Sequence, residues 1–101
     1  MKITSSKESG ILSLALDGEL DHHAAKSTMD KIGHQIDLEL PAKTVLDLSK
    51  LSFMDSSGIA VAVTSFKKMQ SVGGKLEIVN TPKTALKVFN AAKLNRLIDI
   101  K

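Results

Sequence analysis

The chain has 101 residues, of which 43% are hydrophobic and 25% are charged, and its net charge is +3 at pH 7. This length fits one domain with one core, and the composition excludes a disordered chain, which would have fewer aliphatic residues and a larger charge imbalance. The absence of cysteine excludes disulfides, thiolate metal sites and cysteine nucleophiles. We therefore expect a single domain over residues 1–101.

Two strands are predicted at the beginning of the chain. Residues 2–5 form a candidate strand, and Gly10 separates it from a second candidate strand over residues 11–17. Alternate residues of the second strand are leucines, namely Leu12, Leu14 and Leu16. Alternate side chains of a strand share one face, so we expect this face to be buried.

A helix is predicted next, followed by a short strand. Asp21 is a candidate N-cap for a helix that runs to about Glu39. Apolar residues at helical spacing mark its inner face, namely Ala25, Met29, Ile32 and Ile36. Pro41 closes this region, and residues 44–48 have the apolar character of a buried parallel strand.

The second half of the chain begins with another predicted helix. Asp55 is a candidate cap for this helix, which extends to about Ser71. The glycine pair at 73–74 ends the helix in a turn, because glycine tolerates positive φ. The expected inward stripe consists of Ile59, Ala62, Val63, Phe66 and Met69.

The last quarter of the chain predicts a strand over residues 76–79 and a third helix. Thr81 is a candidate cap for that helix, and the proline after it suits a first helical position. Leu86 and Phe89 are expected to point inward. Residues 94–100 fit either a short helix or a strand. The order β-β-α-β-α-β-α predicts an α/β protein with a mixed sheet of four to five strands and helices packed on it.

Three short motifs of the sequence resemble functional sites but also fit ordinary surface positions. Asp21-His22-His23 resembles a metal-ligand cluster, but adjacent helical residues face different ways, so we expect exposed histidines and no metal. Gly73-Gly74-Lys75 joins a helix to a strand, the reverse of a phosphate-binding loop. A Gly-x-Ser-x-Gly elbow is absent, and a triad of Ser57, His22 and Asp55 stays open as a minor alternative.

The net positive charge of the chain does not by itself indicate that it binds nucleic acid. The lysines are scattered, and the three aromatic residues are all phenylalanine, which leaves little for bases to stack on. The longest apolar stretch, residues 59–63, is far too short to span a bilayer. The N-terminal residues lack an apolar run of signal-peptide length. We expect a cytoplasmic protein with no nucleic-acid or membrane partner.

The most informative segment is Leu51 to Ile59, where an apolar strand ends and two serines open a helix. An ordinary helix start with Asp55 as its cap is one interpretation. The other is a phosphorylation site at Ser57, because helix N-termini accommodate anions and a phosphate adds about −1.5 to −2 charges. In that interpretation Gly58, which has no side chain, lets a partner approach closely.

At this segment the sequence resembles a known family. Met54-Asp55-Ser56-Ser57-Gly58-Ile59 is similar to the signature of the STAS domains of bacterial anti-sigma factor antagonists. Residues 18–25 resemble the start of the first helix in these proteins, and residues 45–49 and 73–76 resemble their central strand and a later turn. The pieces together resemble most closely the antagonists that act in sporulation. The resemblance covers nearly the whole chain and implies the STAS fold.

The resemblance implies a phosphorylation-switched binding protein and not an enzyme. Unphosphorylated antagonists of this family bind an anti-sigma factor that is also a serine kinase, which frees the sigma factor for transcription. The kinase uses ATP to phosphorylate the second serine of the motif, here Ser57, and the complex dissociates. A phosphoserine phosphatase restores the antagonist, and no cofactor is implied.

The resemblance also implies a partner-binding surface around the acceptor serine. Its expected residues are His22, His23, Asp55, Ser56, Ser57, Gly58, Ala60, Thr64, Lys67 and Lys68. Two positions depart from the family pattern. Ala60 stands where relatives often have glycine, and residues 90–94 replace a Ser-Gly-Leu-like turn, so the resemblance does not decide whether the last helix forms. Two other roles stay open: a STAS subunit of a transporter or stress-signalling assembly, and a small-ligand site such as a nucleotide at the Asp55 helix start.

Overall fold

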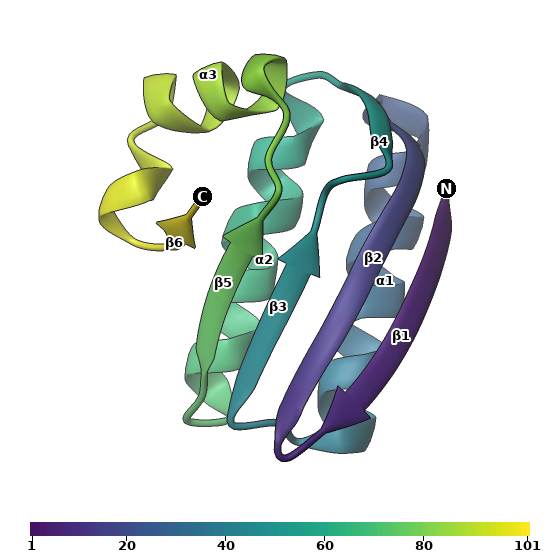
Figure 1. Cartoon of the computed structure of the whole chain (residues 1–101), viewed down its shortest axis with the longest axis vertical. Helices are drawn as coiled ribbons and strands as arrows, with labels where there is room; N and C mark the ends of the chain where they lie inside the picture. Colours follow the sequence, from purple (N-terminus) through teal and green to yellow (C-terminus); the bar gives the residue numbers. More distant parts are fainter.

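A mixed β-sheet carries two long helices on one of its faces (Figure 1). This computed structural model describes residues 1–101, so the whole chain is covered. The elements in chain order are β1 (Lys2–Glu8), β2 (Ile11–Leu20), α1 (His22–Glu39), β3 (Lys43–Asp47), β4 (Leu51–Met54), α2 (Ser57–Ser71), β5 (Lys75–Val79), α3 (Lys83–Ala91), η1 (Leu94–Arg96) and β6 (Asp99–Ile100). The predicted α/β class is confirmed.

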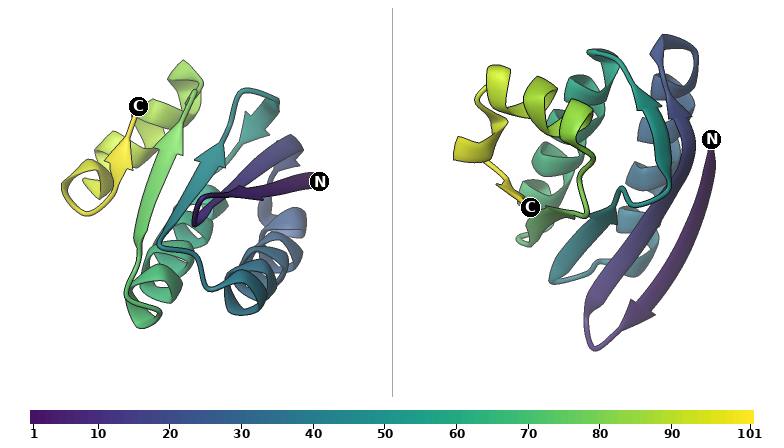
Figure 2. Two further views of the ribbon diagram at one scale, coloured as in Figure 1. Left: turned by 60° about the horizontal axis from the view of Figure 1, so that its bottom comes forward. Right: turned by 45° about the horizontal axis from the view of Figure 1, so that its top comes forward.

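The sheet has six strands, so the expected four to five strands were too few. Its order is β1-β2-β3-β5-β6, with β1 antiparallel to β2 and the other neighbours parallel. The long strand β2 pairs with β3 along its first half and with β4 near its end. The third helix and the C-terminal segment lie beyond β5, away from the edge formed by β1 (Figure 2).

The leucine face of β2 forms the centre of the core, as predicted. Leu12, Leu14 and Leu16 are each no more than 1% exposed, and they pack beneath the helices. In α1 the expected inner residues are buried except Met29, which is only partly buried, and Thr28 is buried instead. The two periodicities therefore placed the buried face of β2 and most of the buried face of the first helix correctly.

The buried face of α2 differs from the predicted stripe. Ile59, Val63 and Phe66 pack only at the edge of the core. The buried residues of this helix are Gly58, Val61, Ala62, Ser65 and Met69. The helix is turned so that small residues face its neighbours, and Ser65 satisfies its buried hydroxyl by donating to the Val61 carbonyl at 2.7 Å. A stripe chosen by hydrophobicity alone misses such residues.

The predicted helix caps have different outcomes. Asp21 caps α1 as expected, since its carboxylate accepts a hydrogen bond from the Ala24 amide at 2.9 Å. The proposed cap at Thr81 is wrong, because Pro82 holds the N-cap position in an extended conformation and no side chain caps α3. Thr81 instead donates its backbone N–H to the carbonyl of Lys101 at 3.0 Å, so its backbone serves the C-terminal segment.

The C-terminal tail contains both of the predicted alternatives. A 3-10 turn at Leu94–Arg96 is followed by the two-residue strand β6, which runs parallel to β5. In α3, Phe89 points inward as expected, while Ala85 is buried and Leu86 is only partly buried. The tail therefore completes the edge of the sheet.

Glu77 on β5 ties this tail to the sheet. The residue is only 8% exposed, and its carboxylate pairs with the ammonium groups of Lys101 and Lys43. These two cations, Lys101 first and Lys43 second, lower the pKa of Glu77 from 4.5 to about 2. The ion pairs join β3, β5 and the end of the chain.

These ion pairs predict a loss of stability in acid. A carboxyl group whose pKa is lowered by folding contributes stability that is fully present above its unfolded pKa and is lost as the pH falls toward its folded pKa. Because both lysines are partly exposed, we expect the ionised Glu77 to add about 1–2 kcal/mol to the free energy of unfolding. This contribution should disappear as the pH falls from 4.5 to about 2. Thermal unfolding across this range should give a shallower pH dependence for Glu77→Gln than for the parent; parallel curves would contradict this role.

Candidate functional site

The two long helices begin side by side at one end of the sheet. Leu20, the last residue of β2, pairs with Met54, the last residue of β4. Because these strands are parallel neighbours, the helices that follow them start at the same end, the upper end in Figure 1. This topology brings His22 next to Asp55, although 33 residues separate them.

Asp55 connects the first turns of both helices. Its Oδ1 accepts the Ser57 amide at 2.8 Å, and its Oδ2 accepts the His22 amide at 3.2 Å. Hydrogen bonds, chiefly from the Ser57 amide, hold the pKa of Asp55 below its ordinary value. The predicted cap at Asp55 was displaced by one position, because Ser56 is the N-cap and its own side chain makes no capping bond. Asp55 nevertheless supplies the carboxylate that holds the start of α2.

Ser57 is the first residue of α2 and is partly exposed. The backbone N–H groups around it are not free. Its own amide donates to the Asp55 carboxylate, and the next amide, of Gly58, donates to the Asp55 carbonyl at 3.1 Å. The expectation that this helix N-terminus accommodates a phosphate on Ser57 is therefore not supported by these two amides, which are already bonded within the turn. A phosphate there would instead meet the negative charge of Asp55.

Gly58 serves internal packing. It is buried, and a Cβ atom built on it would lie 2.6 Å from Cγ of Met54, too close for any real contact. The reason first given for Gly58, room for a partner, is corrected by this contact. The missing side chain makes room for Met54, and that residue joins the end of β4 to the core.

The expected partner residues farther along α2 are partly available to solvent. Ala60, Thr64 and Lys67 are exposed. Lys68 is held across the gap between the helices by Asp37, with 2.7 Å between Nζ and Oδ1. These positions fit a surface that continues from Ser57 along the helix; their binding role stays a prediction.

The two adjacent histidines lie at the exposed start of α1. The ring centroids of His22 and His23 are 5.9 Å apart and the rings are steeply inclined to each other. No group of three or more His, Asp or Glu side chains lies close enough together to hold a metal ion. Asp55 accepts the backbone amide of His22 and that of Ser57, so its carboxylate is occupied by amides and not by an imidazole. The catalytic-triad alternative is therefore not assembled.

Phe53 is a residue that the sequence reasoning missed. It lies on β4 two positions before Asp55, and half of it is exposed. It pairs with Glu19 in the register between β2 and β4. Exposed aromatic side chains often anchor protein interfaces. The available signal was its place in the segment Leu51 to Ile59, directly before the signature, but β4 was missing from the expected order of elements.

The fold and these residues define the class of protein. Residues 2–101 match the family of STAS domains, and the chain belongs to this family. The expected STAS fold, a mixed sheet with helices packed on it, is thereby confirmed.

Particular relatives point to one branch of the family. The anti-sigma F factor antagonist of Lysinibacillus sphaericus is 35% identical over 80% of this chain and 69% of its own length. The corresponding protein of Paenibacillus polymyxa is 33% identical over 81% of this chain and 72% of its own length.

Solved structures of the antagonist SpoIIAA have the same fold. Its unphosphorylated form is 29% identical, with a TM-score of 0.70 over 88% of this chain and 82% of that one. The phosphorylated form from Bacillus is 27% identical, with a TM-score of 0.75 over 99% of this chain and 91% of that one. This chain is thus similar to a protein that has been solved in both states.

Proposed function

We propose that this chain is an anti-sigma factor antagonist whose binding is switched off by phosphorylation of Ser57. The observation that carries the proposal is the position of Ser57. It opens α2 at the molecular surface, and its amide is bound to Asp55, which also holds the start of α1. The names of the relatives, and the existence of a phosphorylated SpoIIAA, support the same role.

The unphosphorylated chain acts as a single STAS domain that binds an anti-sigma factor and frees the sigma factor. The starts of α1 and α2 offer the histidine pair, Ser56 and Ser57. Phe53, half exposed on β4, adds apolar surface in the preceding strand. Exposed aromatic side chains often anchor protein interfaces.

Phosphorylation ends this binding through charge. The partner kinase transfers the γ-phosphoryl group of ATP to Oγ of Ser57. ADP leaves as the bond to the γ-phosphorus breaks, and the hydroxyl proton passes to a base of the kinase or to solvent. The product carries about −1.5 to −2 charges beside the Asp55 carboxylate, which is ionised at neutral pH as any ordinary aspartate is. The transfer chemistry belongs to the kinase, so this chain is a substrate and not an enzyme. A phosphatase reverses the step.

We place the protein and its partners in the cytoplasm. This placement follows from the proposed role, since a sigma factor and its regulators act on transcription. None of the helices has the length and apolar character needed to cross a bilayer.

The proposal is tested with the anti-sigma factor kinase of the same organism. The two purified proteins are mixed, with and without ATP, and peptide mass spectrometry locates any phosphate. We expect a complex without ATP, and phosphate on Ser57 with loss of the complex when ATP is present.

Two variants serve as matched controls for this experiment. Ser57→Ala should bind and stay unmodified, while Ser56→Ala should be modified like the parent. Phosphate on another residue would overturn the assignment of Ser57. Absence of both binding and modification would refute the antagonist role and favour a subunit of a transporter or stress-signalling assembly.

A further inference from the structure

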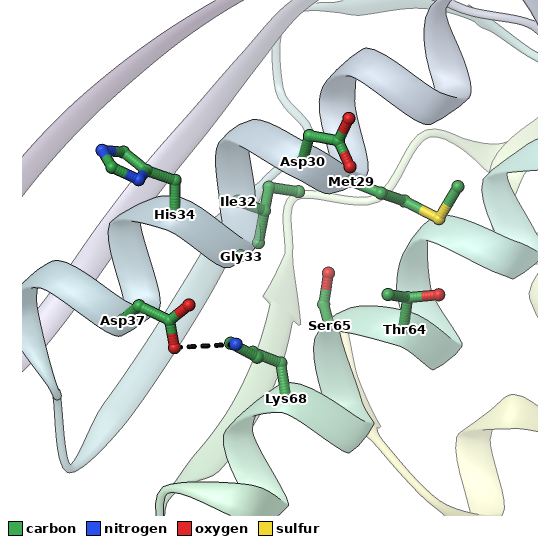
Figure 3. Close-up of a pocket in the computed structure, with 9 residues that line it drawn as sticks. All are labelled: Met29, Asp30, Ile32, Gly33, His34, Asp37, Thr64, Ser65 and Lys68. Carbon is green, nitrogen blue, oxygen red and sulfur yellow. Dashed lines mark ion pairs between the residues drawn. The ribbon is translucent and has the colours of Figure 1, made fainter.

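A groove of about 380 Å³ runs between α1 and α2 (Figure 3). The ion pair between Asp37 and Lys68 crosses it toward the C-terminal ends of the helices. Its lining residues are Met29, Asp30, Ile32, Gly33, His34, Asp37, Thr64, Ser65 and Lys68. The groove lies outside the segment around Ser57. Of its lining residues, only Thr64 and Lys68 belong to the expected partner surface, and the α1 wall has no role assigned so far.

Gly33 keeps this groove open. It lies in the interior of the 18-residue helix α1, where glycine is less favourable than any residue except proline. A Cβ atom at Gly33 would meet no heavy atom within 4 Å, and its φ is not positive, so neither packing nor backbone conformation requires glycine. Gly58 is the opposite case, because Met54 fills its space. At Gly33 the only visible consequence of glycine is free space in the groove.

The groove is continuous with the surface around Ser57. Thr64 and Lys68 follow Ser57 by seven and eleven residues, close to whole numbers of helical turns, so the three lie on one face of α2. On α1, Asp30 follows His23 by seven residues and shares its face in the same way. A partner seated over Ser57 therefore meets the groove about 10 Å farther along α2.

The charge of the groove differs from that of the chain. Asp30, Asp37 and Lys68 leave the lining with one net negative charge when His34 is neutral, whereas the chain carries +3. Asp37 is neutralised by Lys68, but Asp30 has only the solvent-exposed Lys26 at 3.4 Å. Met29 and Ile32 add apolar surface to the same wall. The groove is thus complementary to a basic side chain next to an aliphatic one.

We propose that this groove binds a basic, partly apolar segment of the anti-sigma factor, so that the interface extends from Ser57 along both helices. The inference rests on the proposed function and adds a second contact region to it. The space above Gly33 receives an aliphatic side chain of the partner, and Asp30 binds a lysine or arginine beside it.

Calorimetric titration of the unphosphorylated chain with the purified anti-sigma factor tests the groove. Gly33→Ala should melt at a higher temperature than the parent and yet bind about fivefold more weakly. Gly33→Leu should bind at least about 20-fold more weakly, because it fills the space. Ser27→Ala is the matched control, since Ser27 is an exposed residue of α1 outside the lining. It should bind like the parent.

A second pair of variants tests the charge. Asp30→Asn should weaken binding about threefold at low salt and less at high salt, whereas Asp17→Asn, on an exposed position of β2, should change nothing. Binding of Gly33→Leu at the parent's affinity would overturn the groove inference and leave the antagonist role intact. Failure of the parent itself to bind would refute the proposed function.

Discussion

Ser57→Asp is expected to weaken binding to the anti-sigma factor about 30-fold or more, with little change in melting temperature. Aspartate adds about one negative charge where a phosphate adds nearly two. The new carboxylate lies next to Asp55, whose Oδ1 already holds the amide of residue 57. Two adjacent carboxylates at the centre of the proposed interface repel each other, and burying both beneath a partner removes the water that solvates them. The affinity is measured by calorimetry and the melting temperature by circular dichroism.

Ser56→Asp is the matched control for this charge. Ser56 is exposed and holds the N-cap position of α2, where aspartate is favourable. We expect this variant to lose much less affinity than Ser57→Asp, because the added charge lies outside the acceptor position. Equal losses would show that any negative charge in this region blocks the partner. Parent-like affinity of Ser57→Asp would contradict the charge mechanism.

Gly58→Ala is expected to lower the free energy of unfolding by about 2 kcal/mol. The new Cβ would lie 2.6 Å from Cγ of Met54, and even closer to its sulfur atom. Met54 is almost fully buried, so its side chain moves only at the expense of its neighbours. Chemical denaturation of the parent and the variant gives the difference directly.

A double-mutant cycle identifies the cause of this loss. Met54→Ala is destabilising by itself because it leaves a cavity. In the Met54→Ala background, however, Gly58→Ala should cost about 1–2 kcal/mol less than it does in the parent. Gly33→Ala, with no atom in its way, should raise stability by about 0.5–1 kcal/mol. A neutral Gly58→Ala would mean that the contact with Met54 carries no strain.

The sequence predicted elements whose residues repeat with a clear period. Leu12, Leu14 and Leu16 identified β2, and Asp21 identified the start of α1. Strand β4 was not counted because its burial pattern has no alternation: Leu51 and Met54 are buried and the two residues between them are exposed. Its place is determined by pairing with the end of β2, which lies 34 residues earlier in the chain at the Leu20–Met54 pair.

The sequence motif predicted where the candidate site lies, and the contacts in the structure explain the roles of its residues. The motif located Ser57, but the reasons given for its neighbours did not all hold. Gly58 turned out to face Met54, and Asp55 turned out to serve two helices. The bond from His22 to Asp55 depends on which strand ends are adjacent, and the Gly58–Met54 contact depends on how the chain turns from β4 into α2, so neither follows from local propensity. The groove at Gly33 depends on the packing of α1 against α2 in the same way.

The carboxylate of Asp55 also couples the first turns of α1 and α2, because it accepts a hydrogen bond from each. The Asp55 carboxylate accepts one hydrogen bond from the His22 amide and one from the Ser57 amide, so a group that displaces Asp55 from one helix weakens its contact with the other. Under the proposed function, we therefore expect phosphorylation of Ser57 to affect the histidine pair of α1 through the Asp55 side chain, which contacts both helices. This coupling would require no shift of the sheet.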